Sequence, residues 1–195
     1  LIMSEEFVWV EKYRPKKISD CILPTNIKKT FQDFLDKGEV PNLLLAGPPG
    51  CGKTTVAKAL CEELGADYYV INGSDEGRFL ETVRVNAKNF ASTLSLQASA
   101  KHKVVIIDEA DNTTPDVQLC LRAFTEEFIG NCRFIFTCNY KNKIISPLHS
   151  RCAVIDFSIK GRDRQELAAA FFARIKEILV LEKVESEQKV LAELI

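Results

Sequence analysis

This sequence has no excess of either charge and no long apolar run, and each absence removes a class of protein. Its 26 basic and 27 acidic side chains leave a formal net charge of −1. That balance excludes a chain that binds nucleic acid through overall positive charge, although a local basic patch remains compatible with it. The apolar runs fall far short of the roughly 20 residues that span a bilayer. We therefore expect no membrane partner.

Closely spaced cysteines are also missing. The chain has seven cysteines, an odd number, and no two lie within four residues of each other. The C-x₂-C and C-x₄-C spacings of zinc sites are thus absent. No secretory signal is recognisable, and we exclude the "LI" before Met3 from fold reasoning. These features predict reduced thiols and a cytoplasmic location.

What the sequence does contain is an alternation of strand and helix patterns. With 46% hydrophobic residues among 195, the chain can bury the core of one α/β domain and begin a second. Helical spacing recurs at 27–37, 53–64 and 115–128. Between these segments lie short apolar runs without alternation, typical of strands buried on both faces of a sheet. The five runs are 42–46, 68–72, 104–108, 133–138 and 153–157. The pattern predicts an α/β fold with a central, mostly parallel five-stranded sheet flanked by helices.

The last part of the chain has a different composition. After residue 157 the patterns are helical only, over 161–184 and again from 185. We predict a core domain over 1–160 and the start of a small helical lid domain over 161–195. Because a helix that begins about ten residues before a terminus is not a natural stop, we expect the lid domain to be truncated here.

A phosphate-binding motif lies between the first predicted strand and the helix that follows it. Residues 47–54, "GPPGCGKT", fit the pattern G-x-x-x-x-G-K-[ST]. Its glycines let backbone amides wrap a phosphate at a helix N-terminus. Lys53 would reach the β- and γ-phosphates, and the Thr54 hydroxyl would ligate Mg²⁺. The expected nucleotide contacts are Gly47, Pro48, Pro49, Gly50, Cys51, Gly52, Lys53, Thr54 and Thr55.

An acidic pair follows the third predicted strand, in "VVIIDEAD" at 104–111. The strand would deliver Asp108 at its carboxyl end, the edge where α/β proteins bind ligands. Asp108 would hold Mg²⁺ through water, and Glu109 would polarise the attacking water. The pair favours hydrolysis over phosphoryl transfer to a metabolite. Since "NYKN" at 139–142 is not a guanine-reading motif, we expect ATP as the nucleotide.

Several segments together resemble those of a known family. In chain order they are "WVEKYRP" (9–15), the phosphate loop, "IIDEAD" (106–111), "TCNY" (137–140) and "SRC" (150–152). This set is similar to the AAA+ sliding-clamp loaders: to the replication factor C small subunits, and particularly to the large subunit of the loaders of T-even-like bacteriophages. The resemblance covers nearly the whole chain, with two departures. The four-cysteine zinc module of bacterial relatives is absent, and the family's second sensor arginine and collar domain would lie beyond residue 195.

The resemblance implies roles for residues outside the phosphate loop. Arg151 would be a finger that reaches the γ-phosphate bound by the neighbouring subunit. Asn139 would be the first sensor, hydrogen-bonded to the attacking water or the γ-phosphate. The segment along adenine and ribose would offer apolar contact from Val10 and Ile22, and largely backbone contact from the rest. Its members are Val10, Glu11, Lys12, Tyr13 and Ile22.

The resemblance also implies contacts with DNA and a clamp. Arg78, Arg84 and Lys88 would grip the phosphates of primed DNA without reading its sequence. The alternative is that these cations belong to a solvated helix face. Leu94 and Leu96 would touch the clamp, or else pack under the sheet.

The function implied is that of an ATP hydrolase subunit of a clamp loader, active mainly in the assembled complex. Its partners would be other loader subunits, a sliding clamp and primer–template DNA. One alternative is another AAA+ remodeller of DNA, such as a helicase loader or branch-migration motor, which "SRC" and "EKYRP" disfavour. A second is a metabolite kinase, in which Glu109 would have little purpose. A third is a non-hydrolysing scaffold subunit, which is disfavoured by the intact Lys53, Thr54, Asp108 and Glu109.

Overall fold

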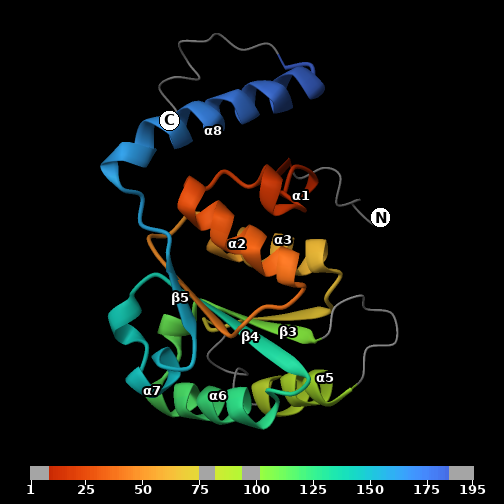
Figure 1. Cartoon of the computed structure of the whole chain (residues 1–195), viewed down its shortest axis with the longest axis vertical. Helices are drawn as coiled ribbons and strands as arrows, with labels where there is room; N and C mark the ends of the chain where they lie inside the picture. The colour runs from red at the N-terminus through yellow and green to blue at the C-terminus, as the bar shows by residue number, and fades with distance from the viewer. Residues whose placement is uncertain (1–8, 75–81, 94–101, 185–195) are drawn as a thin grey trace.

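Five parallel strands form the sheet at the centre of the molecule, in the order β2-β3-β4-β1-β5 (Figure 1). The computed structural model describes residues 9–74, 82–93 and 102–184. The strands are β1 (Leu43–Ala46), β2 (Tyr68–Asn72), β3 (Lys103–Asp108), β4 (Cys132–Cys138) and β5 (Ala153–Asp156). Each lies within one residue of its predicted apolar run at both ends. The predicted five-stranded sheet is confirmed, and every pairing in it is parallel.

The strands are apolar throughout because both faces of the sheet are covered. In β1, which lies between β4 and β5, Leu43 and Leu45 face one core while Leu44 and Ala46 face the other. All four are nearly inaccessible to solvent. A strand buried on both sides shows no alternation of polar and apolar residues. Burial on both faces is therefore the reason why these strands appear in the sequence as continuous apolar runs.

One face of the sheet is covered by α2 (Thr25–Lys37) and α3 (Lys53–Leu64), with the short helical turn η2 (Ile18–Asp20) beside them. The helix predicted over 27–37 is confirmed as part of α2, and its apolar side chains Ile27 and Phe31 are buried. Phe34 and Leu35 pack at its margin. The Phe31 ring meets the Phe157 ring edge-on, with centroids 6.3 Å apart. This contact ties α2 to the segment that follows β5.

The other face carries a second set of helical elements. In α6, which was predicted over 115–128, the Thr114 hydroxyl caps the N-terminus and Pro115 occupies the first turn. The Gln118 side chain of α6 is buried and bonds the backbone of Thr113, Lys143 and Ile145, so α6 is linked to the segment before α7. The elements of this face are the π-helical turn η3 (Thr82–Ala87), α5 (Lys88–Ser92), η4 (Ala110–Asn112), α6 (Pro115–Glu127), η5 (Lys141–Lys143) and α7 (Ser146–His149).

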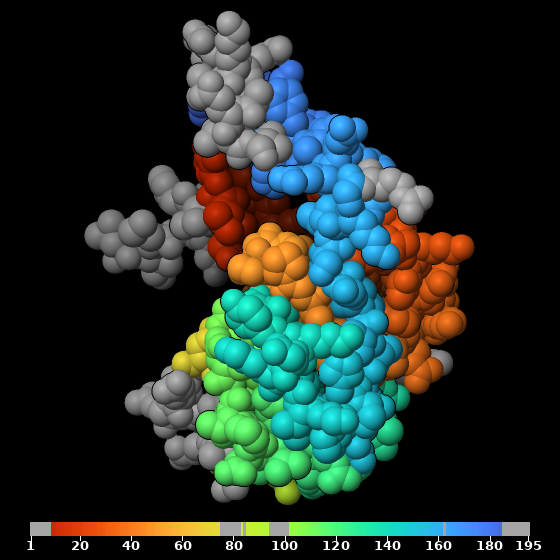
Figure 2. Space-filling model, turned by 90° about the vertical axis from the view of Figure 1, so that its left-hand side faces the viewer, coloured from red at the N-terminus to blue at the C-terminus, as the bar shows by residue number. Residues whose placement is uncertain are grey.

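Two elements lie outside this three-layer core. The helix α8 (Gly161–Leu181) crosses over α1 (Trp9–Lys12) and α2 on the side away from the sheet (Figure 1). Figure 2 shows a recess between α8, in blue, and α1, in red. The helix predicted after residue 161 is confirmed. The further helix predicted from residue 185 lies outside the described residues, and the domain boundary near residue 160 stays a prediction.

Two further findings concern the cysteines and the lengths of the helices. All seven cysteines are free thiols. Burial raises the pKa of Cys61 and Cys152 to about 12, which keeps both thiols protonated at neutral pH. Among the described residues, every helix is too short or too polar to cross a membrane.

We predict that Phe31→Ala lowers the free energy of unfolding by about 3–5 kcal/mol, because the ring is fully buried and packs edge-on against the rings of Phe34 and Phe157. Urea unfolding followed by circular dichroism measures the change. Ile129→Ala is the matched control, since Ile129 is 59% exposed and its truncation should cost no more than about 0.5 kcal/mol. Equal losses in the two variants would contradict this account of the core.

Candidate functional site

The strand order brings the sequence motifs together at one edge of the sheet. Because all strands are parallel, their carboxyl ends share that edge. The neighbours β3, β4 and β1 end there in Asp108, Cys138 and Ala46. Asp108, Asn139 and the phosphate loop, which lie far apart in the sequence, therefore meet at one place.

The phosphate loop leads from β1 into α3, as its motif predicts. Gly52 precedes α3 with a φ of 85°, a left-handed conformation that glycine adopts without strain. The amides that follow open a 12-residue helix, whose N-terminus favours negative charge. The loop and the first turn of α3 thus form an anion cradle.

Lys53 is folded inward beneath the loop, and its side chain is buried. Its ammonium donates to the carbonyls of Gly47 and Pro48 at 2.8 Å each, and to Asn139 Oδ1 at 3.0 Å. The bond to Asn139 joins the phosphate loop to the end of β4. It places the predicted lysine and the predicted sensor in direct contact.

A hydroxyl and a carboxylate lie side by side where the sequence predicts a magnesium site. The hydroxyl of Thr54 donates to Asp108 Oδ1 at 2.5 Å, and that of Thr137 donates to the same oxygen at 2.6 Å. Among the described residues there is no cluster of three or more His, Cys, Asp or Glu side chains suited to a metal. One carboxylate and one hydroxyl nevertheless fit Mg²⁺, which keeps several waters and takes the rest of its ligands from phosphates. Thr54 and Asp108 are the oxygens that would hold it.

Glu109, next to the end of β3, has an unusual backbone. Its φ is 53°, the left-handed region that non-glycine residues seldom occupy and that is found at functional sites. Its amide donates to the Thr137 hydroxyl at 3.0 Å. Its carboxylate accepts bonds from the Ser74 hydroxyl and from Asn112 Nδ2, the latter at 3.1 Å. The carboxylate is thus held by Asn112 of the turn that Glu109 begins and by Ser74, which follows β2.

The end of β2 approaches this turn very closely. A Cβ on Gly73 would lie 2.5 Å from the carbonyl oxygen of Glu109 and 3.0 Å from that of Asp108. Only glycine fits there, and its amide donates to the Asp108 carbonyl at 2.7 Å. Ser74 is thereby brought within reach of the Glu109 carboxylate.

Asp111 holds the end of β4 in place. It is buried, and its Oδ2 accepts from the amides of Asn139 and Tyr140 at 3.1 and 3.0 Å. Because the backbone is fixed in this way, the Asn139 side chain is directed at Lys53.

Sequence reasoning gave no role to Thr137, Asp111, Ser74 or Gly73. Thr137 and Asp111 belong to the motifs "TCNY" and "IIDEAD", and a polar residue at the end of an apolar strand within a motif is a signal that could have pointed to them. For Ser74 and Gly73 the sequence offers no comparable signal, because their contacts arise only when β2 lies beside β3.

An apolar pocket of about 700 Å³ opens beside the phosphate loop. Its walls come from α1 and its following turn, from the loop itself, and from α8. The structure brings Val10, Tyr13 and Ile22 to this pocket with Gly50, Cys51, Gly52 and Thr55. A further pocket of about 450 Å³ beside the same loop is lined by Gly47, Pro48, Pro49 and Asn139.

Two residues predicted beside the base direct their side chains elsewhere. Lys12 donates to Glu182 Oε1 at 2.8 Å, and Glu11 accepts from Arg14. Neither lines the pocket. The backbone contact with the nucleotide that the resemblance implies for these two residues stays a prediction.

Arg151 is held away from the phosphate loop. Its Nε donates to Glu126 Oε1 at 2.7 Å, and a terminal nitrogen donates to the carbonyl of Pro147 at 2.7 Å. The hydrogen bond from Arg151 and the nearby charge of Arg122 hold the pKa of the Glu126 carboxyl below its usual value. Since both partners of Arg151 lie on α6 and α7, its guanidinium does not contact the nucleotide cradle of its own chain.

The predicted DNA contacts are only partly visible. Lys88 lies at the start of α5 and pairs with Glu127 on α6 at 3.2 Å. Arg84 belongs to η3, but its side chain is outside the described part, as are Arg78, Leu94 and Leu96. The predicted contacts of these residues with DNA and the clamp therefore stay predictions.

A parallel sheet with a lysine-bearing phosphate loop beside an acidic strand end defines a P-loop nucleotide-binding domain. The sequence pattern of the ATPase family associated with various cellular activities (AAA) matches residues 43–158. The chain belongs to this AAA family.

Replication factor C small subunits and phage clamp-loader subunits are similar to this chain in sequence. A replication factor C small subunit of Methanocella arvoryzae is 44% identical over 160 residues, covering 80% of this chain and 49% of the relative. A sliding-clamp-loader large subunit of Escherichia phage RB69 is 41% identical over 201 residues, covering all of this chain and 61% of the relative. The same subunit of Enterobacteria phage T4 is 40% identical over 198 residues, with the same coverage. The chain thus spans about half to three fifths of these curated relatives.

Solved structures agree on the fold. A point variant of Thermotoga maritima RuvB superposes with a TM-score of 0.66 at 23% identity, covering 92% of this chain and 58% of the other. The RuvB Holliday junction branch migration motor of the same organism gives 0.61 at 23% identity, covering 85% and 55%. At this identity the likeness shows a shared fold alone.

We predict that Thr137→Val lowers the free energy of unfolding by about 1–3 kcal/mol, because it leaves the Glu109 amide without its acceptor and removes a donor from Asp108. Urea unfolding measures the loss. Thr137→Ser is the matched control, since it keeps the hydroxyl. If valine and serine were equally stable here, the hydroxyl bridge would not be what holds this edge together.

Proposed function

We propose that this chain is an ATP-hydrolysing subunit of a DNA polymerase sliding-clamp loader. The observation that supports this most is the meeting of Lys53, Thr54 and Asp108 with Glu109 and Asn139 at one edge of the sheet. A scaffold subunit would have no need to keep these groups in contact. The identities of 40–44% to replication factor C and phage clamp-loader subunits support a clamp-loader assembly as the setting.

In this proposal each residue has a separate task. The apolar pocket between α1 and α8 takes the adenine base, with Val10 and Ile22 against it. The amides of the phosphate loop and the Lys53 ammonium hold the β- and γ-phosphates. Lys53 then exchanges its carbonyl partners for phosphate oxygens, while Asn139 remains beside it as the sensor.

Hydrolysis requires a water in line with the γ-phosphate and a carboxylate to orient it. Mg²⁺, held by Thr54 and Asp108, would neutralise charge that develops on the phosphates. Glu109 accepts a hydrogen bond from the attacking water, which directs the water's lone pair at phosphorus. Thr137 and Asp111 act through other groups: Thr137 holds Asp108 and the Glu109 backbone, and Asp111 holds Asn139.

Arg151 completes the site of a neighbouring subunit. Its guanidinium is bound to α6 and α7 and does not reach the phosphate loop of its own chain. An arginine supplied from a neighbour is worth on the order of 10³ in rate or more. We therefore propose that hydrolysis is fast only in the assembly.

The remaining parts of the proposal concern partners and place. The loader would open a sliding clamp and release it on primer–template DNA, with Arg78, Arg84 and Lys88 against the DNA phosphates and Leu94 and Leu96 against the clamp. Residues 161–195 would begin the lid domain. The cytoplasm, including that of a host cell, is a setting in which seven free thiols stay reduced.

A branch-migration motor is the main alternative, since RuvB shares the fold. It would make the chain a remodeller of DNA junctions. The stronger identity to clamp-loader subunits favours the loader. Clamp-stimulated and primed-DNA-stimulated ATP turnover, measured against junction DNA, separates the two functions.

We predict that Glu109→Gln preserves ATP binding but lowers turnover in the assembled loader by at least about 10²-fold, because the amide cannot take up the water's proton as a carboxylate does. Calorimetry measures binding, and phosphate release measures turnover. Lys53→Ala should instead abolish binding, whereas Lys58→Ala on the same helix should preserve it. Full turnover in Glu109→Gln would exclude Glu109 as the catalytic carboxylate.

We predict that Arg151→Ala leaves ATP binding by the isolated chain unchanged and depresses hydrolysis at the adjacent subunit's site. Mixed assemblies of Arg151→Ala and Lys53→Ala subunits should recover part of the lost turnover, because some interfaces then pair an intact Lys53 with an intact Arg151. Arg122→Ala, which removes the other arginine on Glu126, is the control and should retain activity. Stable mixed assemblies without recovery would rule out action in trans.

A further inference from the structure

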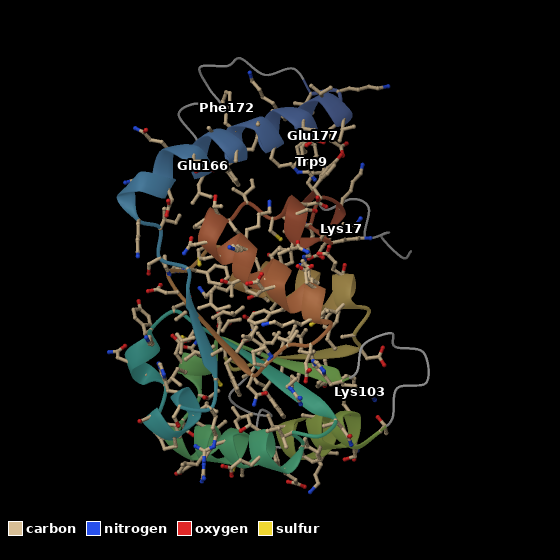
Figure 3. All side chains as sticks on the ribbon, in the orientation of Figure 1. Trp9, Lys17, Lys103, Glu166, Phe172 and Glu177 are labelled. Atoms are coloured by element: carbon tan, nitrogen blue, oxygen red, sulfur yellow. The ribbon has the colours of Figure 1, made fainter. Side chains whose placement is uncertain are left out.

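A single carboxylate joins the far end of α8 to the segment that lines the apolar pocket. Glu182 Oε1 accepts a hydrogen bond from Lys12 Nζ at 2.8 Å and one from the Tyr13 hydroxyl at 2.6 Å. These partners are 170 and 169 positions away in the sequence. Figure 3 shows Trp9 of α1 beneath the half of α8 that carries Glu177, so this end of α8 lies over α1.

The stability of α8 itself does not explain this carboxylate. Glu182 is the C-cap of α8. A helix C-terminus has partial negative charge, so a carboxylate there is unfavourable and a cation would be favoured. The two donors from α1 and the residue after it compensate for that repulsion. The hydrogen bonds from Lys12 and Tyr13 hold the pKa of the Glu182 carboxyl below its usual value, so it is charged at neutral pH.

The contact lies across the pocket from the point where the chain enters α8. One wall of the pocket comes from Trp9, Val10 and Tyr13, and the opposite wall comes from Phe171, Ile175 and Ile178. At its first residue, Gly161, α8 is tied covalently to the sheet through the segment after β5. At its other end the Glu182 bonds tie it to α1. The distance between the two walls therefore depends on both attachments.

We propose that Glu182 is a positioning residue that clasps α8 onto α1 and so retains the nucleotide in the pocket, a role that rests on the proposed nucleotide site. Glu182 does not line the pocket and acts through Tyr13 and α8. With the clasp broken, α8 spends more time away from α1. The apparent affinity for nucleotide then falls by the fraction of time for which the pocket is open.

The test is the rate at which a fluorescent ADP leaves the protein, followed by stopped flow after mixing with excess ATP. We expect Glu182→Ala to speed release by about three- to five-fold, as suits a contact made near the surface. Tyr13→Phe, which removes one hydroxyl, should speed it less. The double variant should release no faster than Glu182→Ala, because both changes break one contact.

Two further variants separate the clasp from general effects on α8. Glu166→Gln removes an exposed carboxylate from the same helix and should leave release unchanged. Exchanging the charges, Lys12→Glu with Glu182→Lys, should restore slow release that either reversal alone abolishes. A role confined to folding would show as a lower melting temperature without a change in release.

The outcomes are distinguishable. If the unchanged protein fails to bind ADP, the proposed nucleotide site is wrong and the clasp with it. If it binds ADP but Glu182→Ala releases it at the unchanged rate, the clasp alone is overturned. Should Glu182→Ala fail to fold, Tyr13→Phe decides, and an unchanged release rate in that variant overturns the clasp.

Discussion

The hydroxyl of Thr137 is the interaction on which the geometry of the site depends. It donates to the Asp108 carboxylate and accepts from the Glu109 amide, and so fixes β3 and β4 at the edge where they end. Asp108 in turn accepts from Thr54 at the start of α3. Three segments are thereby held by one carboxylate oxygen and one hydroxyl. Without that bridge, Asp108 would lose a donor and the Glu109 amide would lose its acceptor, at the edge where the proposed metal ligands and catalytic carboxylate lie.

Beyond this bridge, further polar contacts hold the residues of the site in place. Asp111 fixes the backbone of Asn139, and Gly73 lets Ser74 reach Glu109. At the periphery, Glu126 holds Arg151 and Glu182 holds Tyr13. These contacts are made by single side chains between segments that are distant in the sequence. The proposed chemistry, subunit communication and nucleotide retention therefore depend on tertiary packing of a few polar groups.

Much of the fold could be predicted because burial leaves a direct mark on the sequence. Strands such as β1 are covered on both faces, and they are continuous apolar runs for that reason. The phosphate loop could be predicted because its chemistry requires particular residues at fixed spacing. The side chains of Glu11 and Lys12 show the opposite case. The sequence placed both residues in the segment expected along the nucleotide. No neighbouring residue in the sequence indicates that the Lys12 side chain turns to Glu182, 170 positions away.

The sequence by itself determined the strands, the main helices and the phosphate loop. It also singled out four candidate site residues: Lys53, Thr54, Asp108 and Glu109. Each of these depends on local spacing or on burial of neighbouring residues. Only the tertiary structure decided the strand order, the bridge through Thr137, the clasp at Glu182 and the orientation of Arg151. These depend on which distant segments meet, and a hydrogen bond of about 3 Å has no periodicity that a linear pattern could record.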